Sequence, residues 1–183
     1  MIYQQANTTG AETDHQAFSN AASSDFAGAW NDTLPTSSVF TIGTSAAHNV
    51  SGQACMAYVF TEIEGFSRYG VFTGNGNADG PVIHCGFTPA LIWIKERSAI
   101  DSWFAYDHKR QTHNGIIANL ILDTTAAESS STFAIDFLAN GFKVRNADGA
   151  NNTNQSQYIF CAWALHPFGG EDVTPAPAMA WFG

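Results

Sequence analysis

At 183 residues and 45% apolar content, the chain can form one sizeable or two small domains with a real core. Only 13% of the residues are charged and the net charge is −9, with every Lys and Arg between Arg68 and Arg145. Residues 1–67 therefore carry acids and no base, which argues against nucleic-acid binding because such a surface repels phosphates.

No apolar run is long enough to span a membrane, and the N-terminus lacks the basic and apolar regions of a signal peptide. We therefore expect a soluble protein with no membrane insertion and no secretion signal. The surface, poor in charge and rich in Asn, Ser and Thr, is typical of extracellular β-proteins, fibres and virion shells rather than cytosolic enzymes.

Helix signals are nearly absent along the chain. The candidates are short, at residues 17–23, 115–122 and 125–129, and the middle one is compatible with either a helical turn or a strand. Elsewhere, β-branched and aromatic runs alternate with Asn, Gly and Ser turns, which is typical of a sandwich or barrel. The sequence predicts an all-β protein with less than about 10% helix.

The most apolar stretch follows the turn Gly86-Phe87-Thr88-Pro89. Residues 91–94 predict a buried strand, covered on both faces, with Pro89 at its start where no ladder hydrogen bond is lost. Residues 101–107 predict the second strand of a hairpin, which would carry Trp93 and Trp103 into one core. We expect the strands around Phe104 and Phe142 to flank this central strand.

A weak internal repeat is visible when the sequence is shifted by 103 positions. The shift aligns residues 39–42 with 142–145, and residues 57–61 with 160–164. It predicts a truncated first β module at residues 1–68 and a complete second one at 69–170, which is about one and three-quarters tandem modules. The first copy lacks the counterpart of the central strand, so a second module or a neighbouring subunit should cover it.

Residues 171–183 predict an extended, Pro-rich tail that ends in the apolar pair Trp181-Phe182. That pair needs a surface to dock on, either its own domain or a partner subunit. Together with the incomplete first module, the tail leads us to expect a homo-oligomer.

The three cysteines, Cys55, Cys85 and Cys161, are odd in number and far apart, and each lies in apolar sequence. A disulfide framework or a zinc site would need closer, paired spacing. We therefore expect reduced cysteines buried in the core.

The loop at residues 73–80 is the stretch most similar to a chemical motif. Asn75, Asn77 and Asp79 alternate as oxygen ligands do in a calcium loop, but the later glutamate is missing and His84 stands in that region. A plain surface turn is the favoured interpretation.

Three other groups of residues could suggest catalysis, and each has a structural explanation that fits better. His84 and Cys85 are neighbours on a strand and should point to opposite faces. The group at residues 107–110 with His113 reads as a solvated turn. Glu62 and Glu64 fit simple strand alternation better than a glycosidase pair. We therefore assign no catalytic, cofactor-binding or metal-binding residue, and expect neither an enzyme nor a cofactor.

Several segments together resemble repeated modules of marine-phage and cyanophage virion proteins, usually tail-fibre or appendage proteins. They cover nearly residues 2–170 and include residues 30–33, 35–41, 62–70 (Glu62-Ile63-Glu64-Gly65-Phe66-Ser67-Arg68-Tyr69-Gly70), 72–81, 86–89, 135–145 and 158–168. One departure is Leu165-His166 before the closing Pro167-Phe168, where such modules usually carry an acidic residue. A second is that the chain begins inside a module.

The resemblance implies a lectin-like antiparallel β-sandwich, of jelly-roll or concanavalin-like type, in a phage virion appendage. It implies a trimeric tail-fibre or receptor-binding protein that contacts other virion proteins and a host-surface glycan. The location would be the phage tail or particle surface, after assembly in the bacterial host cytoplasm. The alternatives are a capsid decoration or cement protein and, third, a glycan-degrading enzyme on a lectin-like scaffold.

Overall fold

The computed structural model describes all residues except 1, 4–13, 17, 26, 112 and 168–183. The strands are β1 (Ile2–Tyr3), β2 (Asp14–Gln16), β3 (Ser24–Asp25), β4 (Ser67–Thr73), β5 (Val82–His84), β6 (Pro89–Glu96), β7 (Phe104–Asp107), β8 (Ile116–Ile121), β9 (Ser129–Leu138), β10 (Gly141–Val144) and β11 (Gln157–Ala164). The helices are α1 (Ala27–Trp30) and α2 (Gly149–Asn152).

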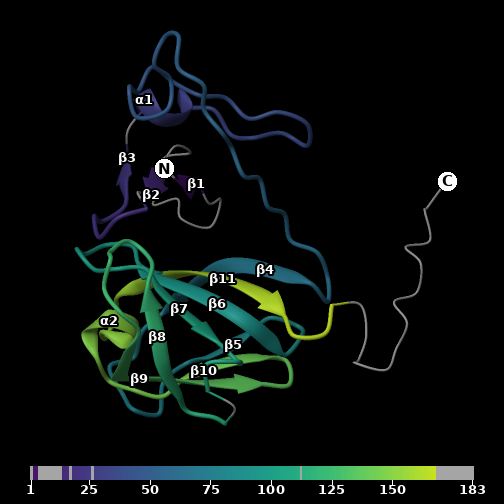
Figure 1. Ribbon diagram of the computed structural model, residues 1–183, viewed down its shortest axis with the longest axis vertical. Helices are drawn as coiled ribbons and strands as arrows, with labels where there is room; N and C mark the ends of the chain where they lie inside the picture. Colours follow the sequence, from purple (N-terminus) through teal and green to yellow (C-terminus); the bar gives the residue numbers. More distant parts are fainter. Residues whose placement is uncertain (1, 4–13, 17, 26, 112, 168–183) are drawn as a thin grey trace, which may run out of the picture.

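The main body is one antiparallel sheet with the strand order β4-β11-β6-β7-β8-β9-β10-β5. The sheet curls into a nearly closed barrel (Figure 1), so its two edge strands, β4 and β5, approach each other. β1, β2 and β3 form a separate small sheet. The protein is therefore all-β with few helices, as the sequence predicts, and in the described part each helix is a single turn.

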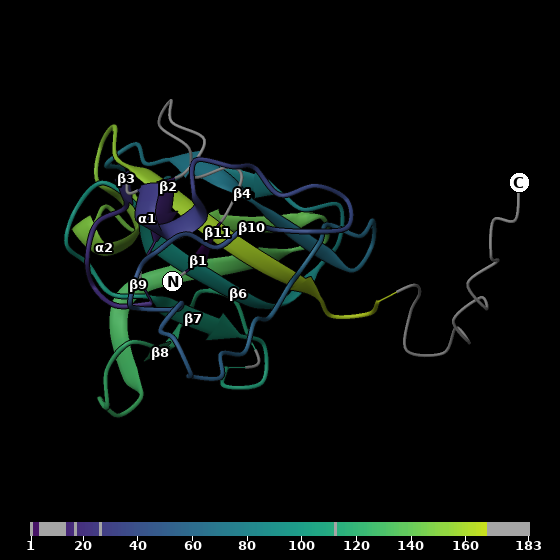
Figure 2. The ribbon, with the colours of Figure 1, turned by 90° about the horizontal axis from the view of Figure 1, so that it is seen from above.

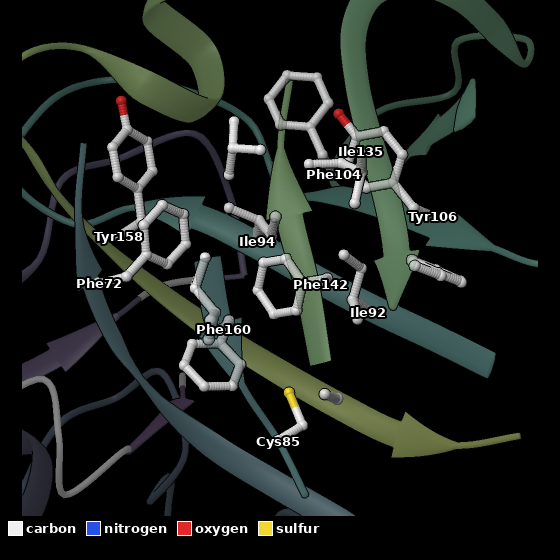
Figure 3. Packing of buried hydrophobic residues seen from close by; sticks show 14 of the residues in the cluster. Phe72, Cys85, Ile92, Ile94, Phe104, Tyr106, Ile135, Phe142, Tyr158 and Phe160 are labelled. Atoms are coloured by element: carbon white, nitrogen blue, oxygen red, sulfur yellow. The ribbon is translucent and has the colours of Figure 1, made fainter. Parts of the chain in front are cut away.

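The core fills the inside of the curled sheet. Figure 3 shows Phe72 from β4, Phe142 from β10 and Phe160 from β11 meeting there. The ring centroids of Phe142 lie 5.5 Å from Phe160 and 6.1 Å from Phe72, at edge-to-face angles that aromatic pairs favour. Inward residues alternate along each strand, which is why Ile92 and Ile94 of β6 are fully buried on the same face.

The predicted hairpin is confirmed, because β6 pairs with β7 in antiparallel register. The prediction that the strand around Phe142 flanks β6 is wrong. β6 lies between β11 and β7, while β10, which carries Phe142, pairs with β9 and β5 across the barrel. Both segments are apolar, and only sheet closure decides which edges meet. Residues 115–122, which the sequence left as either a helical turn or a strand, contain strand β8.

Trp103 is fully buried, as predicted, but it lies outside the inner cluster, and Trp93 is not in the core, so the two tryptophans do not share one core. Trp93 points to the outer face of β6, opposite to Ile92 and Ile94, and is half-buried. Phe18 stacks on Trp103 at 5.6 Å and lies 6.3 Å from Trp93, so the N-terminal region supplies the cover. β6 is thus buried on its inner face and only partly covered outside.

The N-terminal region lies over the outer face of β4, β11 and β6 (Figures 1 and 2). Two backbone hydrogen bonds join it to the loop after β6, from Ser23 N to Arg97 O (2.6 Å) and from Asp101 N to Asn20 O (2.9 Å). Beneath it Lys95 is fully buried, and burial lowers the pKa of its amine. Its ammonium donates to the carbonyls of Glu96 and Ala99.

The repeat predicted strands at residues 39–42 and 57–61, and the structure has none at either place. Both segments are largely exposed, and neither pairs with a neighbouring strand in the structure. Neither helix candidate is helical: in 17–23 the described residues 18–23 are irregular, and in 125–129 residues 125–128 are irregular and Ser129 begins β9. The division at residue 68 remains a prediction, and the tail at 171–183 lies outside the described residues.

Candidate functional site

An outer aromatic row runs across three strands of the barrel. It consists of Tyr69 on β4, Trp163 on β11 and Trp93 on β6, all half-buried. The ring centroids of Trp163 lie 5.9 Å from Tyr69 and 5.0 Å from Trp93, in edge-to-face geometry. Three adjacent strands place these side chains on one face, and the result is a continuous aromatic surface.

One residue of the preceding segment packs against this outer aromatic row. The Phe60 ring lies 6.4 Å from Tyr69 and 6.1 Å from Trp163, yet it is itself 59% exposed. Burial raises the pKa of the Tyr69 phenol, so the ring stays neutral at physiological pH. The rings meet edge-to-face, and the Tyr69 hydroxyl is hydrogen-bonded to the side chains of Ser67 and Trp163. The row thus combines apolar ring faces with polar groups, which is the chemistry that sugar sites use.

A recess opens between the two edge strands of the barrel. It has a volume of about 380 Å³ and is lined by residues of β4, β5 and β11, among them Phe72, Ile83 and Phe160. Val71 and Val82 stand at its outer rim and are partly exposed. We call this opening the β4/β5 seam, because it is where the sheet fails to close on itself.

The loop at residues 73–80 is a surface turn whose polar side chains form hydrogen bonds and an ion pair within the protein. The Oδ1 atoms of Asn75 and Asn77 accept backbone N–H groups two residues later. The Asp79 carboxylate pairs with Lys143 at 2.5 Å, and that contact lowers its pKa. Asn152 of α2 holds the loop from inside, through Asn75 Oδ1 and Asn77 O.

The other candidates are placed as separate structural groups. His84 is exposed and Cys85 buried, so the two do point to opposite faces. Asp107 caps the turn by accepting from Lys109 N and Arg110 N. Burial raises the pKa of the Cys85 thiol to about 12, so it is not a nucleophile at neutral pH.

Cysteine placement agrees with the prediction only in part. Cys85 belongs to the core and Cys161 is partly covered on β11, where burial raises the pKa of its thiol to about 12. Cys55 is exposed, which corrects the expectation of a core position. Its apolar neighbours reflect an exposed segment rather than a buried one.

Glu62 and Glu64 do not sit on a strand, so the alternation expected for them is wrong. Glu62 instead contacts β4, pairing with Arg68 at 3.3 Å and accepting the backbone N–H of Tyr69 at 3.2 Å. Within the described residues no cluster of three or more His, Cys, Asp or Glu side chains could hold a metal ion. No helix in the described part is long and apolar enough to cross a membrane.

A family model described as "Domain of unknown function (DUF7483)" matches residues 1–167. The chain belongs to this family. The DUF7483 match runs through the N-terminal region as well as the barrel, so both parts belong to what defines the family. Neither a curated protein nor a solved structure matches the chain.

Sequence reasoning missed two features of this DUF7483 protein. The outer aromatic row was not predicted because a strand with apolar residues on both faces looks fully buried. Alternation along β6 nevertheless places Trp93 on the face opposite to Ile92 and Ile94. The contact of Glu62 with the Tyr69 amide left no signal in the sequence, since it depends on how the chain turns at residues 64–66.

Proposed function

We propose that this DUF7483 protein is a structural component of a phage virion, a tail-fibre or receptor-binding protein whose outer aromatic row binds a host-surface glycan. The observation that carries the proposal is the half-buried row Tyr69, Trp163 and Trp93 on one sheet face, which Phe18 and Phe60 contact from outside. The resemblance to phage appendage modules supports it. The proposal includes the lectin-like sandwich that the resemblance implies and the tandem modules that the internal repeat predicts.

The physical basis is stacking of sugar rings on aromatic faces. Apolar C–H faces of sugars lose water against the rings, while polar atoms at the edge of the row orient the hydroxyls. Trp163 is central because it contacts both other members of the row. A single anchor of this kind commonly dominates an interface.

Trp163→Ala is expected to weaken binding to an array of bacterial surface polysaccharides by about 30-fold. This equals about 2 kcal/mol, the scale of a hot-spot aromatic. Binding is measured by quenching of tryptophan fluorescence and by calorimetry on the sugars that score on the array.

Ile100→Ala is the matched control, since Ile100 is exposed and has no part in the outer aromatic row. It is expected to bind like the wild type, and unfolding curves confirm that both variants are folded. Equal affinity of Trp163→Ala and wild type would contradict the assignment of the row. Wild-type protein that binds no polysaccharide on the array would contradict glycan recognition itself.

The second candidate function is a capsid decoration or cement protein, favoured by apolar residues exposed on the loops between α1 and β4. Val39 is 62% exposed, and Phe40 and Ile42 are each 43% exposed. Such surfaces mark interaction sites. Under either function we propose a homo-oligomer that contacts other virion proteins and raises weak affinity through avidity.

Light scattering on purified protein measures this association. A trimer is expected from the phage-fibre resemblance. The double variant Val39→Asp and Phe40→Asp should shift the protein toward the monomer. Wild-type protein that remains monomeric at micromolar concentration would contradict the oligomer.

An enzyme is the third and weakest candidate, and we propose that the protein is not a hydrolase. Several carboxylates are engaged by cations: Asp79 with Lys143, Glu62 with Arg68, and both Asp107 and Glu128 with Arg110. Release of reducing sugar from host polysaccharide, abolished by one Asp or Glu substitution, would contradict this.

A further inference from the structure

We propose that residues 57–61 form a strap that adds to the free edge of β4 as an extra strand and closes the β4/β5 seam. In the described conformation these residues are exposed and irregular. Tyr58 and Val59 are 78% and 76% exposed. Such side chains favour strands, and the segment leads directly into β4.

The first rung of the extra strand is already present. Ile63 and Ser67 exchange both backbone bonds, at 3.2 Å and 2.9 Å, and form an isolated antiparallel bridge. Gly65, in the turn between them, has φ +72°, which glycine adopts without strain. A hairpin with a three-residue loop is thus closed at its turn.

The register of this bridge sets which residues of the strap would lie opposite which residues of β4. Each step backwards from Ile63 meets one step forwards from Ser67, so Val59 falls opposite Val71 and Phe60 opposite Gly70. Glu62 falls opposite Arg68, and this pair is already in contact at 3.3 Å. The existing ion pair is therefore the cross-strand pair that the register requires.

The same register sends the aromatic side chains into the seam. Phe72 faces the core, and Gly70 lies on the same side of β4. Tyr58 and Phe60, opposite these two residues, would point into the recess of about 380 Å³ between the edge strands. An aromatic side chain across from an edge glycine is a known way to stabilise a sheet edge.

One contact keeps the hairpin open beyond its first rung. In a continued ladder the Tyr69 N–H would bond to Thr61 O, but in the structure it donates to Glu62 Oε1 at 3.2 Å. Thr61 O accepts from the Ser67 hydroxyl instead, at 2.8 Å. Exchanging these two bonds for the second rung allows the strap to close onto β4.

Closure also moves Phe60 away from the outer aromatic row, which it now covers at Tyr69 and Trp163. Uncovering that row is a gain only if the proposed glycan binding holds. The strap itself does not depend on that function, and its test measures no glycan. Failure of one is therefore distinguishable from failure of the other.

The test is a disulfide across the third rung of the closed strap. Val59→Cys and Val71→Cys are introduced in full-length protein carrying Cys55→Ser, which removes the exposed native thiol. Directly opposed residues lie about 5.5 Å apart between Cα atoms, within the range that a disulfide spans. Under mild oxidation an intramolecular disulfide is expected in most molecules, detected by mass and non-reducing gel.

The matched control is Tyr58→Cys with Val71→Cys in the same background. One residue along the strap reverses the face, so this pair should oxidise about tenfold more slowly or worse. Equal rates for the two pairs, or no crosslink at Val59 and Val71, would overturn the proposal. A crosslinked dimer would also overturn it, because the strand would then come from a second copy.

Hydrogen exchange on the unaltered protein decides the matter if the double variants fail to fold. The amides of Val59 and Thr61 would bond to β4 in the closed strap and should exchange at least about tenfold more slowly than unprotected amides. Exchange at the unprotected rate throughout residues 57–61 would overturn the proposal.

Discussion

Phe142→Ala is expected to lower the free energy of unfolding by about 3–5 kcal/mol, the usual cost of removing a buried aromatic ring. Phe142 is fully buried, and its ring contacts those of Phe72 and Phe160. β10 also pairs with the edge strand β5 beside the seam, so the ring supports the strand that holds β5 to the sheet. A loss of this size is a large share of the stability of a small domain.

Urea unfolding followed by tryptophan fluorescence measures the change, as a shift of the midpoint at constant slope. Ile100→Ala is the control, because Ile100 is 78% exposed on the loop after β6 and should change stability by less than about 0.5 kcal/mol. A loss below about 1 kcal/mol for Phe142→Ala would mean that the ring does not hold β10 to the rest of the core.

The second large effect is expected at Asn152, the buried residue of α2 that fastens the loop at 73–80. Its Nδ2 lies 2.6 Å from Asn146 O and 2.8 Å from Asn77 O, and its Oδ1 accepts Asn75 N at 2.8 Å. Asn152→Ala leaves these groups without their partner. Each unsatisfied buried group costs about 1–3 kcal/mol, and water can reach part of the loop, so we expect a loss of about 2–4 kcal/mol.

Asn152→Asp separates hydrogen bonding from size. It keeps the acceptor for Asn75 N but sets a carboxylate against the carbonyls of Asn77 and Asn146, so it should destabilise at least as strongly as alanine. Asn154→Ala is the exposed control and should be nearly neutral. If Asn152→Asp were as stable as the wild type, the amide donor would not be what holds the loop.

Local chemistry was enough to predict much of the fold. Turn-punctuated β-branched runs predict an all-β chain, and Pro89 with the run after it predicts strand β6 and its hairpin partner β7, all as found. These predictions hold because a hairpin joins residues that are close in sequence, so its partner is decided by the turn. The two faces of His84 and Cys85 follow from alternation in the same way.

Longer-range features could not be predicted from residue type alone. Phe142 was expected beside β6 and instead lies on β10, next to the far edge strand β5, because closure of the barrel chooses among several apolar strands of similar character. Residues 57–61 have strand chemistry but no strand partner in the structure, where the Tyr69 amide donates to the carboxylate of Glu62. Residue type shows a preference for strand, while actual pairing depends on which backbone groups of the neighbouring strand already have other partners.

The sequence by itself determined the class of the protein: β-rich, poor in charge, acidic at its N-terminal end and built on a hairpin around Trp93. These properties follow from composition and short-range alternation, which every segment carries with it. The tertiary structure alone decided that Tyr69, Trp163 and Trp93 share one outer face and that β4 and β5 leave a seam. Both depend on which distant strands become neighbours, and that is decided by the closing of the whole sheet around one core.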